Sequence, residues 1–316
     1  MIAHDVLTYL CGRDVGLSDK PIRITPYTYG DMDTALYNSD FPLEMREGKR
    51  PTVTSEEPEY DENDYYTPFV HYDEPRDGTV PAIQVLSLYS VEPDWGMDFG
   101  LRLSPLQSLM GGSQGYRHLR YSLCFLRAGV AHKRTLYFHS LSNRAFRSGD
   151  VYWGVRFAAR AIHYIEDMLT PFHTKPFPES FLLKKMLNPK GLFFITYNYH
   201  MNFERFSGYH LWHGRRDFID PIQAAQVFPI RRLGSVLFRN WNRMRALFYP
   251  LFRECRKLWG DTMINGPFRL NRDDVARINP HGPLLEATQK WLESTASVVK
   301  GYIVQYVIPS MKDATG

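Results

Sequence analysis

The chain has 316 residues, which is enough for one large domain or two ordinary ones. Its composition, 44% hydrophobic and 23% charged, excludes an intrinsically disordered protein, and its net charge of +4 is too small to indicate a dedicated nucleic-acid-binding protein. The three cysteines are isolated and show no CxxC spacing, so neither a disulfide framework nor a thiolate zinc finger is expected. Any metal is therefore expected to bind histidines and carboxylates.

The N-terminal part of the chain is predicted to be mostly irregular. An apolar periodic segment at residues 3–10 predicts a short helix that ends at Gly12. Residues 18–90 are rich in proline and show few helical repeats, so we expect a long irregular insertion there. Within it, residues 56–64 carry six carboxylates in nine positions, a pattern typical of a solvated acidic loop.

The rest of the chain predicts helices. Their expected ranges are residues 116–127, 151–170, 192–212, 233–258 and 284–308. We expect Asp150 to cap the second of these helices, Pro171 to stop it, and Pro250 to kink or split the fourth. The glycine-rich residues 110–115 predict a turn rather than a phosphate-binding loop. The expected architecture is an all-α fold with a single domain over residues 1–316.

No segment predicts export or membrane insertion. The N-terminus lacks the basic start and long apolar run of a secretory signal. Residues 294–311 are the most apolar stretch, but Lys300 and Gln305 interrupt it, so it falls short of the roughly 18 uncharged apolar residues that span a bilayer. The sequence therefore predicts a soluble protein that is cytoplasmic by default.

Two histidine–carboxylate pairs carry the strongest chemical signal. His163 and Asp167 are four residues apart in one predicted helix, and His200 and Glu204 are four apart in another, so each pair shares a helix face. His173 follows ten residues after His163. One such pair is usually a surface ion pair, but two pairs in apolar surroundings need compensation, which a divalent cation supplies. The five residues together predict a metal site.

Other histidines are weaker candidates. His71 follows the acidic loop and His4 lies on the first predicted helix; each alone is more typical of a surface or capping histidine, although scattered histidines can complete a catalytic zinc site. The remaining six have no matching spacing and are expected to be surface or satisfied polar residues, with a place in the cleft left open for the first of them: His118, His132, His139, His210, His213 and His281.

These motifs resemble the zinc-dependent phospholipase C family, which is similar in fold to the single-strand-specific zinc nucleases. The resemblance rests on IHYIEDMLTPFH at residues 162–173 and on HMNFERF at residues 200–206, where Glu204 matches the phospholipase branch. It extends to the acidic, tyrosine-rich EYDENDYYTPFVHYDEP at residues 59–75. The resemblance implies an all-helical fold with up to three zinc ions in a cleft.

The resemblance also implies a set of ligands. One zinc ion would bind Asp61, His71, His163 and Asp167; a second would bind His173, His200 and Glu204; a third would bind His4 and share Asp167. Asp61 is one choice among the acids of its loop, with Glu57, Glu59 and Asp64 as alternatives. The family's third zinc ion takes groups of an N-terminal tryptophan, which this chain lacks, so either Met1 supplies its amino group or the site is incomplete.

The expected function is hydrolysis of a phosphodiester by a metal-activated water, with Asp61 or a neighbouring acid as the base. The preferred substrate is a phospholipid. A nuclease or nucleotidase is the nearest alternative, because basic residues between 231 and 257 could follow a nucleic-acid backbone, lie on an anionic membrane, or simply form a solvated helix face. A non-catalytic, metal-binding scaffold protein is the third alternative.

Overall fold

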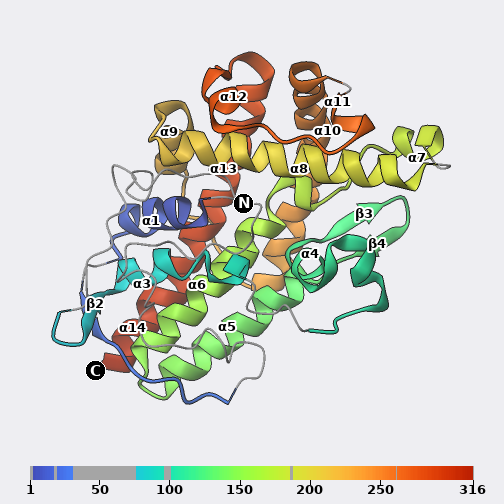
Figure 1. The fold of residues 1–316 in the computed structure, drawn as a ribbon. Coiled ribbons are helices and arrows are strands. Elements are labelled where there is room, and N and C mark those ends of the chain that lie inside the picture. Colours follow the sequence, from blue (N-terminus) through green and yellow to red (C-terminus); the bar gives the residue numbers. More distant parts are fainter. Residues whose placement is uncertain are drawn as a thin grey trace.

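Helices dominate the structure, a computed structural model that describes residues 3–17, 20–30, 76–95, 101–185, 188–260 and 262–315 (Figure 1). The described strands form two small antiparallel pairs. In the first, β1 (Pro21–Arg23) pairs with β2 (Thr79–Pro81), so that Ile22 lies opposite Val80. Because helices make up almost all of the regular structure in the described residues, the expected all-α fold class is confirmed.

Helix α6 (Val151–Met168) lies at the centre of the molecule, packed along its length against α5 (Ala131–Arg147). From Tyr152 onward every residue of α6 is buried. Asp150 caps it as expected, because its side chain accepts a hydrogen bond from the backbone N–H of Trp153. The two helices approach closely at Gly154, where a Cβ atom would lie 2.5 Å from the Phe146 ring. A helix that is buried all round can hold polar groups only if they have partners.

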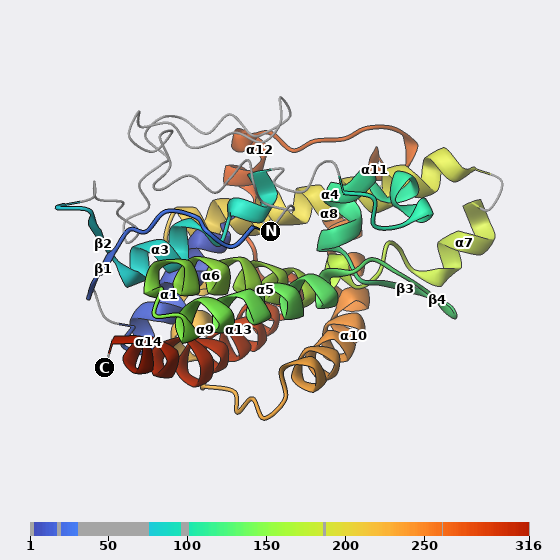
Figure 2. The same cartoon turned by 90° about the horizontal axis from the view of Figure 1, so that it is seen from below.

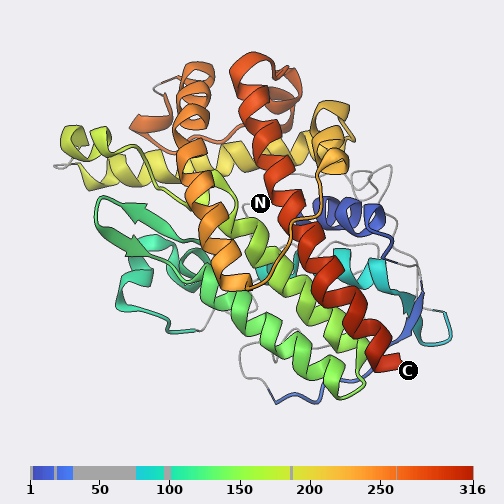
Figure 3. The same cartoon turned by 180° about the vertical axis from the view of Figure 1, so that it is seen from behind.

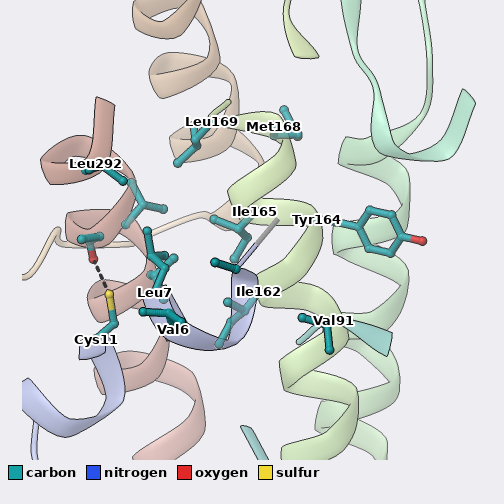
Figure 4. Packing of buried hydrophobic residues seen from close by; sticks show 14 of the residues in the cluster. Val6, Leu7, Cys11, Val91, Ile162, Tyr164, Ile165, Met168, Leu169 and Leu292 are labelled. Atoms are coloured by element: carbon teal, nitrogen blue, oxygen red, sulfur yellow. Dashed lines mark hydrogen bonds between the residues drawn. The ribbon is translucent and has the colours of Figure 1, made fainter. Parts of the chain in front are cut away.

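Three further helices enclose the C-terminal half of α6: α1 (His4–Asp14), α3 (Ala82–Leu88) and α13 (Gly282–Tyr302). Figure 4 shows Val6 and Leu7 of α1 packed between Ile162 of α6 and Leu292 of α13. The Cys11 thiol faces the Ala296 carbonyl at 3.8 Å in the same layer. This apolar packing fixes the N-terminal helix against the helix that carries the HYIED motif.

Helix α8 (Pro189–Trp212) crosses one end of this bundle, and α10 (Leu233–Trp259) and α13 lie side by side behind it (Figures 1 and 3). Pro250 does not split α10, which continues through it. The last predicted helix extends beyond its expected end, because α13 continues through a π-helical stretch (Ile303–Val307) into α14 (Ile308–Thr315).

Shorter elements complete the described chain. They are the 3-10 turns η3 (Glu92–Trp95), η4 (Pro105–Met110) and η5 (Pro171–His173), and the helices α4 (Gly112–His118), α7 (Glu179–Lys185), α9 (Arg216–Ala224), α11 (Thr262–Asn265) and α12 (Arg272–Arg277). Among the described residues, no helix is long and apolar enough to cross a membrane.

Two predictions of local structure are wrong. The helix expected at residues 116–127 ends at His118, and an antiparallel hairpin of β3 (Tyr121–Leu123) and β4 (Leu126–Ala128) follows (Figure 2). Backbone hydrogen bonds to the neighbouring segment 173–174 hold this hairpin, so tertiary pairing overrides the local helical pattern. The region expected to be irregular also contains α3, a short apolar helix in which every residue is buried.

Candidate metal centre

Six separate segments bring histidines and carboxylates together at the C-terminal end of α6. They are α1, η3, α4, α6, η5 and α8, which contribute His4, Asp94, His118, His163, Asp167, His173, His200 and Glu204. Together these residues form three groups in which the ligand atoms lie within 4.8 Å of one another.

The first group combines the α6 pair with two residues from other elements. The Nε2 atom of His163 lies 3.1 Å from Oδ2 of Asp167, as their spacing on one helix face predicts. His118 places Nδ1 2.8 Å from the same oxygen and 2.9 Å from His163 Nε2. Asp94 adds Oδ1 at 3.4 Å from His118 Nδ1. In a tetrahedral zinc site neighbouring ligand atoms are roughly 3.3 Å apart, so the three mutually close donors of His118, His163 and Asp167 can hold one ion, with Asp94 beside them.

The second group joins η5 to α8. His173 Nε2 lies 2.8 Å from Oε1 of Glu204 and 2.7 Å from Nε2 of His200. His200 and Glu204 themselves are 3.1 Å apart across one turn of α8. Pro171 starts the 3-10 turn that redirects the chain after α6 and so brings His173 opposite α8.

The third group contains His4, Asp94 and His163. His4 Nε2 lies 3.7 Å from Oδ2 of Asp94 and 3.8 Å from Oδ1 of Asp167. These distances are longer than those of the first two groups. The third group has three donors, like the second group, and Met1, the other ligand considered for it, lies outside the described residues.

Asp167 lies between the three groups. Its Oδ2 atom faces His118 and His163, whereas its Oδ1 atom lies 3.8 Å from His4 Nε2 and 3.1 Å from His173 Nδ1. The atom by which His173 joins the second group is Nε2, so Asp167 orients this imidazole and can share an ion only between the first and third groups. A carboxylate with its two oxygens directed to different donor groups can bridge metal ions and fix their separation.

Outer partners orient two of the imidazoles. His163 Nδ1 lies 2.7 Å from the carbonyl oxygen of Ser90, and because a carbonyl only accepts, Nδ1 donates and Nε2 keeps its lone pair toward the centre. His4 Nδ1 contacts the buried carboxylate of Glu166, which also accepts a hydrogen bond from the Thr8 hydroxyl at 2.9 Å. Hydrogen bonds of this kind fix the tautomer of metal-binding histidines.

The electrostatics favour ionised carboxylates and neutral imidazoles at most positions. Burial alone would raise the pKa of Asp167, but His163, His118 and His173 outweigh it and hold this pKa well below its usual range. The pKa of Glu204 is lowered in the same way. Burial lowers the pKa of His118 to about 4 and also lowers that of His4. These are the protonation states that metal ligands need.

His173 is the exception. Burial acts to lower its pKa, but Asp167 and Glu204 on either side raise it to about 9. The field of two carboxylates that favours a proton on this ring equally favours a divalent cation between them. The centre is therefore a buried, net negative region suited to cations.

Six of the eight predicted site residues come together: His4, His163, Asp167, His173, His200 and Glu204. Asp61 and His71 lie outside the described residues, as do the alternatives Glu57, Glu59 and Asp64, so their roles stay predictions. The sequence analysis gave no role to Asp94 and no ligand role to His118, although it left His118 a place in the cleft.

Asp94 and His118 belong to one local unit. Gln114 of α4 donates to the backbone carbonyl of Asp94 at 3.3 Å, and Arg117 donates to that of Pro93 at 2.8 Å. Helix α4 therefore holds η3 in place while it supplies His118. Asp94 and His118 lie on two separate short elements, so no fixed sequence spacing relates them. The only sequence features that could have suggested a metal-binding role were the acidic residue Asp94 after a buried helix and His118 in YRHLRY.

No protein-family model, no curated protein and no solved structure matches the chain. The described donors of the site are nitrogen and oxygen atoms without a thiolate, and Asp94, with 36% of its side chain exposed, lies at the accessible edge. Such a set of nitrogen and oxygen donors could hold divalent cations.

Proposed function

We propose that the protein is a zinc-dependent phosphodiester hydrolase of the phospholipase C type. The single observation that carries this proposal is the position of Asp167, whose two oxygens face the first and third histidine–carboxylate groups and whose Oδ1 atom also orients His173 of the second. Imidazole and carboxylate donors suit zinc, and a cluster of close divalent ions suits reactions at phosphorus. The helical class of the fold and the two sequence motifs agree with the resemblance stated above.

Zinc held by these histidines and carboxylates would neutralise phosphoryl oxygens and would lower the pKa of a water ligand toward neutrality. The chain's own residues hold and orient the reactants. Asp94 turns one oxygen toward the first group and the other toward the third, and it is partly exposed, so it is positioned to orient a water and accept its proton. Asp61 stays an alternative for this role.

A nuclease is the second candidate, and one observation favours it. The rings of Phe193 and Tyr197 on α8 stack at 5.8 Å, and they lie on the same helix face as the ligand His200. Exposed aromatic rings can stack on nucleobases. Comparing single-stranded DNA with phosphatidylcholine as substrates separates the two activities, and metal binding without turnover of either would favour the scaffold protein.

The direct test measures metal and turnover together. Purified protein is expected to contain zinc and to hydrolyse bis(p-nitrophenyl) phosphate, and His163→Ala is expected to lose both because it removes a donor common to two groups. His281→Ala is the matched control, since this histidine is exposed at the start of α13. Full zinc content and full rate in His163→Ala would contradict the proposal.

A further inference from the structure

The β3–β4 hairpin ends in apolar side chains that nothing in the described chain covers. Its tip consists of Cys124, Phe125 and Leu126; Phe125 is 90% exposed and Leu126 is 63% exposed. Cys124 adopts a φ of 52°, in the left-handed region that favours glycine, so the turn keeps this residue at a conformational cost of about 1–3 kcal/mol. A strained turn with a protruding phenylalanine is the arrangement of a binding element rather than of a plain connection.

The hairpin is attached directly to the metal centre. The Arg120 N–H donates to the carbonyl of His173 at 3.0 Å, and the Ser122 N–H donates to that of Thr174 at 2.9 Å. Three strand residues carry the tip about 10 Å away from this root. Whatever the tip contacts is therefore held at a fixed distance from the ligand His173.

A second exposed apolar feature lies at the same end of the molecule. Figures 1, 2 and 3 all show the hairpin at the end where α7 and the N-terminal end of α8 lie. There Phe193 is 53% exposed and stacks on Tyr197, which is one turn from His200 on the same face. The hairpin tip and this aromatic pair are two exposed apolar features at the same end of the molecule.

The surroundings of these contacts are basic. No Asp or Glu occurs between Asp98 and Asp150, and of the eight Lys and Arg residues in that stretch Arg117, Arg120 and Arg134 are buried, so the surface charge comes from the others. Arg127 on β4 and Lys133 at the start of α5 are exposed, and Lys190 is exposed in the first turn of α8. Basic side chains around protruding apolar ones complement an anionic bilayer, in which the apolar groups enter about 5–10 Å into the headgroup region.

We propose that the hairpin tip and the aromatic pair are the surface by which this protein docks on an anionic phospholipid bilayer. The inference rests on the proposed function for the identity of the substrate, since docking would present lipid headgroups to the centre. A bilayer fits better than nucleic acid because Leu126 has no π-face for a base, and Phe125 protrudes instead of lining a groove. A bilayer also accepts a protruding side chain without a preformed pocket.

The test measures binding to vesicles in the absence of turnover. The full chain is mixed with vesicles of phosphatidylcholine and phosphatidylserine, and the bound fraction is measured by flotation. The double variant F125S/L126S is expected to bind about 10-fold more weakly or worse, because it removes the apolar contact. Phe125→Trp keeps that contact and is expected to bind like wild type. The matched control Val227→Ser, an exposed apolar residue between α9 and α10, is also expected to bind like wild type.

A charge variant tests the second part of the proposal. Arg127→Glu is expected to weaken binding to vesicles that contain phosphatidylserine, and the difference from wild type is expected to shrink at high salt because exposed charges are screened. Circular dichroism checks that the variants stay folded. We expect them to, because the substituted side chains are exposed in the wild-type protein.

Four outcomes overturn the docking proposal: equal vesicle binding by wild type and F125S/L126S, an equal loss in Val227→Ser, binding of wild type to single-stranded DNA but not to vesicles, or a wild-type dimer that F125S/L126S dissociates. None of them depends on turnover. Hydrolysis of a soluble phosphodiester reports separately on the proposed function, so the failure of one proposal is distinguishable from the failure of the other.

Discussion

Individual residues of the centre differ in how directly the sequence reveals them. His163 and Asp167 share a helix face, so their spacing alone predicts that they meet. His118 and Asp94 meet the same pair from separate elements, and only the fold brings them there. The contact between His163 and Asp167 in the first donor group is therefore set by local sequence, whereas the contacts of His118 and Asp94 depend on the tertiary fold. Mutations of these two residues are the more informative ones.

His118→Ala is expected to lower the zinc content by about one ion per chain and the rate on a soluble phosphodiester by roughly 100-fold or more, because a direct ligand contributes at least as much as the 10- to 100-fold typical of an outer partner. Elemental analysis and steady-state kinetics measure both. His213→Ala, at the exposed end of α8, is the control and is expected to change neither. Unchanged zinc content in His118→Ala would remove this residue from the donor set.

Glu166 acts through another residue, since its carboxylate orients His4 and lies away from the three groups. Glu166→Ala is expected to weaken zinc binding at the His4 group by about 10- to 100-fold, whereas Glu166→Gln, which keeps an acceptor oxygen, is expected to lose less. Competition with a zinc chelator measures the affinities. Equal affinities in wild type and Glu166→Ala would show that His4 needs no such partner or binds no metal.

At the scale of elements, α8 serves two purposes on two faces. One face carries His200 and Glu204, and another carries Asn198 and Asn202. Asn202 donates to the carbonyl of Phe268 at 2.9 Å and accepts from the Leu270 N–H at 2.7 Å. The side chains of these asparagines replace missing backbone partners for the segment between α11 and α12, so this irregular segment is held against the helix that carries the second donor group.

Asn202→Ala is expected to lower the free energy of unfolding by about 1–3 kcal/mol, because it leaves a buried carbonyl and N–H of the 268–270 segment without partners. Asn242→Ala on α10 is the control: its side chain donates to the carbonyl of Phe238 and accepts from Arg245, both on its own exposed helix face, and the change is expected to alter stability by less than about 0.5 kcal/mol. Urea denaturation measures both values, and equal midpoints for the two variants would argue against this bracing role.

The elements also show what the sequence predicts and why it stops there. The ranges of α6, α8 and α10 were predictable because long apolar periodicity, the Asp150 cap and the Pro171 stop are all local signals. The β3–β4 hairpin was not predictable, because the hydrogen bonds that hold it against residues 173–174 join positions about fifty residues apart. The same limit explains the candidate site: pairs within one helix were found, whereas Asp94 depends on an η3–α4 contact that no spacing encodes.

At the scale of the whole molecule, buried apolar residues from Ala3 to Met311 form one connected core, and the donor groups lie within it. Ions bound there would link α1, α4, α6 and α8 in the folded state only. Ligands that bind the folded state alone stabilise it by mass action. Metal content and global stability are therefore expected to change together.

Zinc at about 100 times its dissociation constant is expected to stabilise the protein by about 2.7 kcal/mol per site, and so to raise the midpoint of thermal unfolding by several degrees above that of chelator-treated protein. Differential scanning calorimetry measures the shift. His163→Ala is expected to show a much smaller shift. The same midpoint with zinc and with chelator would indicate that the folded protein holds no such ion.

The bridging position of Asp167 has a consequence for biosynthesis. Its imidazole partners include the fourth residue of the chain and His173, and the second donor group is complete only at Glu204. A ribosome makes the chain from its N-terminus, so the whole stretch from His4 to Glu204 must have emerged before every described donor exists. Until then the Nε2 atom of His173 lacks both of its α8 partners, so the second donor group closes only when α8 packs against η5.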